Sequence, residues 1–182
     1  MNLPSADESE VAVTPHDTEW ARLYVQEAGR VESTFGRRCA AIEHIGSTAV
    51  PGLLAKPIID ILVASVDGVA PSPEELRSLA EQSYGFLGED GRRPGRWFWR
   101  KRGRVCVNLS LVLWSSDLWR DNLLIRDYLR SHPIEVQQYA EIKRQAVAAS
   151  PNSLLGYQNY EREFMTGLRT RALEWRPFSQ GH

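Results

Sequence analysis

Residues 40–65, AAIEHIGSTAVPGLLAKPIIDILVAS, decide how the rest of the chain is organised. An apolar run ends at Ile45, a turn of small residues follows at 46–48, and a second apolar run at 58–63 carries one acid, Asp60. The second run is rich in β-branched residues and too short for a helix, so it predicts an interior strand. A charged, unpaired carboxylate inside such a strand is strongly destabilising, so we expect Asp60 to have a partner.

Two interpretations of Asp60 remain open. In the first, Gly46 allows a tight turn, and the backbone N–H groups and hydroxyls of Ser47 and Thr48 bind a phosphate at the start of a short helix. Asp60 then holds a divalent cation that bridges to this phosphate, and the nearby Lys56 adds positive charge. In the second, Ser47 is only an N-cap, and Asp60 caps a neighbouring helix or pairs with a lysine.

This stretch also resembles a known family. The segments HIGSTAVPGL at 44–53 and AKPIIDI at 55–61 are similar to the motif of the GrpB family. Further similarity occurs at VTP (13–15) with Trp20, at IRDYLR (125–130), at His132-Pro133, and at Tyr139 with Lys143. The resemblance covers nearly the whole chain. It implies the nucleotidyltransferase superfamily fold, an α/β fold with helices flanking a mixed sheet, and a nucleotide-type pocket.

Several residues depart from the pattern that the resemblance implies. Nucleotidyltransferases usually place a second acid two residues after the first, where this chain has Leu62. The stretch that matches the strand of the third acid contains Asn108 and Ser110, where GrpB relatives tend to have histidine. Near the C-terminus the family pattern has a Tyr followed four residues later by a Lys, and this chain has Tyr157 and Glu161 at those positions. These departures put a standard two-metal site in doubt, so we expect weak Mg²⁺ binding, mainly together with a substrate's phosphates.

From the residues and the resemblance together we predict one set of site residues. The catalytic residues are Asp60, Ser47 and Lys56. The residues that bind substrate or phosphate are His44, Gly46, Ser47, Thr48, Arg100, Arg126, Arg130, Lys143 and Tyr157. The metal ligands are Asp60 and Glu27.

Glu27 is included because it lies in the middle of the apolar face of a predicted helix at 18–35. A carboxylate in that position is rarely without a partner. Either it accepts hydrogen bonds from the 46–48 turn or pairs with His44, or it supplies the acid that is missing at Leu62.

Two groups of arginines have competing interpretations. Residues 92–104 contain seven basic residues interleaved with Trp97 and Trp99, and the region predicts a hairpin of strands at 96–100 and 105–113. Three interpretations remain open: the aromatic rings pack in the core, the arginines bind the phosphate of a small ligand, or the hairpin binds nucleic acid. The last is the weakest, because a single small hairpin offers little surface to a nucleic acid. Arg126 and Arg130 lie four residues apart on a predicted helix and bind an anion or pair with an acid such as Asp127.

Composition limits the class of protein. The chain has 182 residues, 42% hydrophobic residues, 25% charged residues and a net charge of −1, which is ordinary for a globular protein and argues against nucleic-acid or membrane partners. We predict disorder at 1–12 and a single domain at 13–182, with a core at about 14–115 and a helical part at about 116–176. Two isolated cysteines and no apolar run near the length of a membrane span predict a cytoplasmic protein; the oligomeric state stays open.

The leading functional hypothesis is nucleotidyl transfer to a small acceptor, with Mg²⁺ and ATP or another nucleoside triphosphate. One alternative is a non-catalytic binding module for a nucleotide or a CoA-type ligand. Another is a small-molecule biosynthetic enzyme that uses the same pocket for different chemistry.

Overall fold

The structure is a computed structural model, which describes residues 12–175. The chain divides into two compact units. Within the described residues, one unit comprises 12–16, Val50–Lys56 and 124–175, and the other comprises Asp17–Ala49 and Pro57–Leu123. The predicted disorder at 1–12 lies almost entirely outside the described residues, and the predicted single domain stays a prediction.

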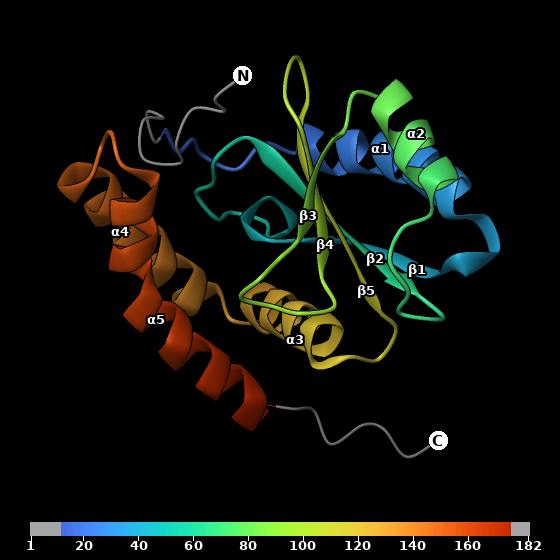
Figure 1. Cartoon of the computed structure of the whole chain (residues 1–182). Coiled ribbons are helices and arrows are strands. Elements are labelled where there is room, and N and C mark those ends of the chain that lie inside the picture. The colour runs from blue at the N-terminus through green and yellow to red at the C-terminus, as the bar shows by residue number, and fades with distance from the viewer. Residues whose placement is uncertain (1–11, 176–182) are drawn as a thin grey trace. The chain divides into compact units, whose positions relative to one another are not determined.

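The second unit is built on a mixed sheet of five strands in the order β1-β2-β5-β4-β3 (Figure 1). The strands are β1 (Cys39–Ile45), β2 (Ile58–Ser65), β3 (Gly85–Glu89), β4 (Trp97–Lys101) and β5 (Cys106–Leu113). The β2–β5 pair is parallel, and the other three pairs are antiparallel. The predicted α/β fold with a mixed sheet is confirmed.

Helix α1 (Glu19–Phe35) covers one face of this sheet, and α2 (Pro73–Glu81) packs beside α1. Phe35 meets Trp99 of β4 edge to face at 6.4 Å, and Ile59 and Ile61 are buried among the core residues. The opposite face carries an apolar cluster in which Leu62 and the helix residue Trp119 are buried. Because strand side chains alternate between faces, consecutive residues of β2 lie in two different environments, one on each face of the sheet.

The other unit consists mainly of helices. Helix α3 (Asp117–Ser131) begins in the sheet unit and ends in this one, and α4 (Pro133–Ala149) and α5 (Leu154–Trp175) follow. Its core is one apolar cluster, whose buried members are Val50, Leu53, Tyr128, Leu129, Val136, Tyr139, Ala140, Leu168 and Ala172. The short segment Val50–Lys56 belongs to the same unit. Its residue Ala55 forms an isolated β-bridge with Thr14, which is also part of this unit.

The sequence patterns located most elements. The helix predicted at 18–35 forms at Glu19–Phe35, and the part predicted to be helical at about 116–176 contains α3, α4 and α5. Strand β3 was not predicted; its sequence GFLGE contains two glycines and no alternation of apolar and polar residues. No helix within residues 12–175 is long and apolar enough to cross a membrane.

Candidate functional site

The turn after β1 lies directly against the Asp60 carboxylate. Ile45, the last residue of β1, pairs with Asp60 of β2, so the next residue, Gly46, lies beside that side chain. Gly46 has φ of 72°, and a Cβ there would lie 3.0 Å from the Asp60 carboxyl carbon and nearer still to Oδ2. Only glycine fits both the backbone angle and the space. The structure therefore brings the predicted residues Gly46 and Asp60 together.

Asn108 holds the other carboxylate oxygen of Asp60. The two residues are register partners on the parallel strands β2 and β5, and Asn108 Nδ2 donates to Asp60 Oδ1 at 2.8 Å. The amide oxygen of Asn108 accepts from the Arg102 guanidinium at 3.0 Å. A third acid in this position would face Asp60 with like charge, whereas the amide links a carboxylate to a cation.

The next positions on this face, two residues further along β2 and β5, have different roles. Leu62, where a second acid was expected, is fully buried in the apolar cluster with Trp119. Its register partner Ser110 accepts a hydrogen bond from Arg96 Nε at 3.0 Å. Burial lowers the pKa of Arg96, and the ion pair of its guanidinium with Asp90 at 3.2 Å opposes that shift. Asp60 is therefore the only carboxylate contributed by β2 and β5 to this face.

The hydroxyls of the 46–48 turn differ in their partners. Thr48 is buried; its hydroxyl donates to the Ile58 carbonyl at 3.2 Å and lies 3.0 Å from His44 Nε2. The His44 ring is buried and stacks on Tyr24 at 4.7 Å, on the α1 face of the sheet. The half-buried Ser47 side chain makes no hydrogen bond with any residue in 12–175. Thr48 and His44 therefore brace the turn through their side chains, whereas Ser47 does not.

Glu27 lies on the opposite face of the sheet from Asp60. Its carboxylate accepts from Lys101 Nζ at 2.8 and 3.0 Å and from the Tyr84 hydroxyl at 2.9 Å. Lys101 pairs with Val107, one residue before Asn108, so alternation directs it away from Asp60. The structure brings Glu27 neither to Asp60, as a metal ligand would require, nor to the turn, as the bracing interpretation expected.

Three further predicted residues come together in the helical unit. Lys143 is buried, and its ammonium lies 3.1 Å from Glu161 and 3.2 Å from the Tyr157 hydroxyl. Lys56 Nζ lies 4.3 Å from the centre of the Tyr157 ring. Burial, and next the Glu161 carboxylate, raise the pKa of Tyr157 well above its ordinary value, so this phenol stays protonated. Glu161, at the position where the family pattern has lysine, neutralises Lys143 here.

Glu161→Gln is expected to lower the free energy of unfolding by about 1–3 kcal/mol, because a buried charge-assisted hydrogen bond is replaced by a weaker one. Thermal and urea unfolding of the variant measure this loss. The double variant Lys143→Met/Glu161→Leu is the control, since it removes both charges together and should recover part of the loss. A double variant less stable than Glu161→Gln would contradict this account.

The two predicted helix arginines are paired with an acid. Arg126 Nε donates to Asp127 at 2.8 Å, and Arg130 lies 3.8 Å from the same carboxylate. This arrangement matches the alternative in which Asp127 offsets the two like charges.

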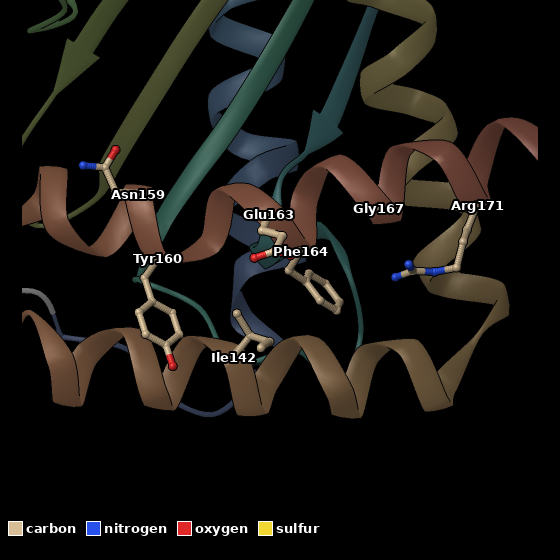
Figure 2. A pocket seen from close by; sticks show the side chains of 7 residues that line it. All are labelled: Ile142, Asn159, Tyr160, Glu163, Phe164, Gly167 and Arg171. Carbon is tan, nitrogen blue, oxygen red and sulfur yellow. The ribbon is translucent and has the colours of Figure 1, made fainter.

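A groove of about 560 Å³ lies between α4 and α5 and contains none of the predicted site residues. Figure 2 shows Ile142 and Phe164 between the two helices and Arg171 at one end. Arg171 donates two hydrogen bonds to Glu135, at 2.7 and 2.8 Å.

Comparison with known proteins places this chain. The family model described as "GrpB protein" matches residues 10–171. The chain belongs to the GrpB family. The crystal structure of conserved protein GrpB from Enterococcus faecalis is similar, with a TM-score of 0.80 and 28% identity; the match covers 90% of this chain and 98% of that one.

Two curated relatives are longer than this GrpB-family chain. UPF0157 protein YqkA of Bacillus subtilis is 31% identical over 168 residues, which cover 91% of this chain and 48% of YqkA. Dephospho-CoA kinase of Mycolicibacterium paratuberculosis is 25% identical over 192 residues, covering 91% of this chain and 46% of that protein. The chain thus spans about half the length of both relatives.

The GrpB motif located the turn and Asp60 but not the cations around them. Arg96 and Arg102 were not predicted as site residues, although alternation along β4 puts Arg96, Phe98 and Arg100 on one face. Nothing in the sequence indicated that this is the face of Asp60, because β4 pairs with β5 and reaches β2 only through it.

Within residues 12–175, no three His, Cys, Asp or Glu side chains are grouped so that they could hold a metal ion. A single carboxylate suits Mg²⁺ only when the ion arrives with a substrate's phosphates, which supply further oxygen ligands.

Proposed function

We propose that this protein binds a nucleotide or another phosphorylated small molecule at the sheet face around Asp60, and that it transfers a nucleotidyl group to a small acceptor. The supporting observation is the approach of the Gly46 turn to Asp60, with the Ser47 hydroxyl at the next position. The nucleotidyltransferase superfamily, which the resemblance implies, builds its pocket from a turn and a strand acid of this kind.

Each residue has a chemical role in this proposal. The Ser47 hydroxyl donates a hydrogen bond to a phosphate oxygen. The Asn108 amide holds the Asp60 carboxylate in a fixed orientation, in which it would hold a Mg²⁺ ion that enters with the ligand. Bound Mg²⁺ would supply neutralisation of phosphate charge. The nearby guanidiniums attract the anion.

The variant Asp60→Asn separates the contribution of Asp60 to metal binding from its repulsion of the phosphates. With Mg²⁺ present, we expect the affinity for nucleoside triphosphates to fall about tenfold or more, which corresponds to about 1.4 kcal/mol. Without Mg²⁺, affinity should stay unchanged or rise, because the variant removes a carboxylate that repels the phosphates. Isothermal titration calorimetry in both conditions measures the difference.

Ser47→Ala is the matched control, because it removes a phosphate contact and should weaken binding by a similar factor with and without Mg²⁺. Wild-type protein that binds no nucleotide or phosphorylated metabolite in either condition would overturn the proposal. Release of pyrophosphate from labelled triphosphates tests the transfer step.

A non-catalytic module for a CoA-type ligand is the second candidate. It is favoured by the similarity to a protein named dephospho-CoA kinase, of which this chain matches 46%. CoA that competes with ATP, without any turnover of either, would support this candidate over nucleotidyl transfer.

A further inference from the structure

Strand β4 presents a row of cationic and aromatic side chains on the Asp60 face. Phe98 pairs with Ser110, and Arg100 pairs with Asn108, the register partner of Asp60. The Phe98 ring lies between two guanidiniums, with the Arg96 carbon 4.8 Å and the Arg100 carbon 5.5 Å from the ring centre. These cation–π contacts restrict both arginine side chains; Arg96 also forms an ion pair with Asp90, whereas Arg100 has no carboxylate partner within residues 12–175.

Arg102, just beyond the end of β4, is held more firmly. Its guanidinium donates to the carbonyls of Lys101 and Val107 at 2.9 and 3.1 Å, and to the Asn108 amide oxygen at 3.0 Å. All three acceptors are neutral. The orientation of the guanidinium is therefore fixed while its positive charge is retained.

Arg100 and Arg102 are both exposed, and in their pairing they differ from three partly buried arginines. Arg38, Arg126 and Arg171 each form an ion pair with a carboxylate. Within residues 12–175, neither Arg100 nor Arg102 forms such a pair. Burial first, and next the charge of Arg100, lower the pKa of Arg102, and the Asp60 carboxylate opposes this shift.

We propose that Arg100 and Arg102 form a clamp for two adjacent phosphate groups, so that the ligand carries a diphosphate or triphosphate rather than a single phosphate. This inference rests on the proposed function, because it concerns the same site. An anion between the two guanidiniums relieves their repulsion, and each guanidinium matches the geometry of a phosphate.

The spacing of the two arginines favours adjacent phosphates over one. Arg100 pairs with Asn108 from within β4, and Arg102, just after the strand, donates to the Asn108 amide oxygen, so both cations lie beside Asn108 at separate positions along the chain. Two cations held apart in this way contact neighbouring groups of a phosphate chain more readily than one group. Two guanidiniums and the Asp60 carboxylate together carry a net positive charge, so the attraction grows with the number of negative charges on the anion.

The test uses phosphate anions without a base or a metal. Calorimetry at fixed ionic strength, in metal-free buffer, measures the affinities for inorganic phosphate, pyrophosphate and tripolyphosphate. Wild-type protein should bind pyrophosphate at least tenfold more tightly than phosphate. In Arg100→Ala/Arg102→Ala this preference should disappear, and Arg100→Lys/Arg102→Lys should keep part of it because the charges remain.

Arg37→Ala/Arg77→Ala is the charge-matched control. Both of these arginines are exposed, and they lie on η1 (Gly36–Arg38) and on α2, which both contact α1. This control should keep the preference for pyrophosphate. If it loses the preference as completely as the clamp variant, a general loss of positive charge explains the effect and the clamp is wrong.

The outcomes separate this inference from the proposed function. Nucleotide and pyrophosphate binding that is unchanged in the clamp variant would overturn the clamp and leave the proposed function standing. Wild-type protein that binds nucleotides but prefers no diphosphate would do the same. Protein that binds neither overturns both. If Arg102→Ala fails to fold, Arg100→Ala alone decides, because Arg100 is exposed and makes only the ring contact.

Discussion

Replacing Glu27 by alanine is expected to lower the free energy of unfolding by about 3–5 kcal/mol, because it leaves the Lys101 ammonium without its carboxylate. Glu27 is 4% exposed, and the Lys101 side chain is 16% exposed. The Tyr84 hydroxyl would lose its acceptor as well. Urea unfolding followed by circular dichroism measures the loss.

Glu27→Gln keeps the shape and some hydrogen bonds, so a smaller loss of about 1–3 kcal/mol is expected. The double variant Glu27→Leu/Lys101→Met removes both charges and should recover most of the stability lost in Glu27→Ala. Arg30 contributes little, because its side chain is 65% exposed and solvent screens the pair. A double variant as unstable as Glu27→Ala would show that the ion pair is not the cause.

The same variants test whether Glu27 acts at the ligand site. Because Glu27 and Asp60 lie on opposite faces of the sheet, folded Glu27→Gln should bind nucleotides as the wild type does. A variant that keeps its stability and loses nucleotide binding would instead support the metal-ligand interpretation.

Gly46→Ala is expected to lower the free energy of unfolding by about 2–4 kcal/mol and to abolish nucleotide binding, because the new methyl group collides with the Asp60 carboxylate. The backbone angle, φ of 72°, adds strain for any residue with a Cβ. Relief of the collision requires Asp60 to move away from Asn108, which breaks their hydrogen bond.

Gly95→Ala separates the two contributions. Gly95 has a φ of 80°, and a Cβ there would meet nothing within 4 Å. It should therefore show only the cost of the backbone angle, about 1–2 kcal/mol. Equal losses in the two variants would mean that the approach to Asp60 has no energetic consequence.

Local patterns were sufficient to predict most of the fold. The β-branched run at 58–63 forms β2. The length and composition of this run were enough to predict a strand without any tertiary information. The start of α2 also depends on local chemistry, because Ser72 and Glu75 form a capping box there and Pro73 follows the cap. Strand β3 escaped prediction because most of its residues are exposed, so it is defined by pairing with β4 rather than by an apolar pattern.

Part of the candidate site could likewise be predicted from the sequence. By itself the sequence determined that a glycine turn precedes a strand acid and that Glu27 lies on the apolar face of a helix, because period and composition are local properties of the chain.

Only the tertiary structure decided the partners. Glu27 meets Lys101 across 74 residues, and Asp60 meets Asn108 across 48. A periodic pattern fixes the face on which a side chain lies, but the strand order β1-β2-β5-β4-β3 fixes what it meets there, and strand order depends on pairing between distant segments.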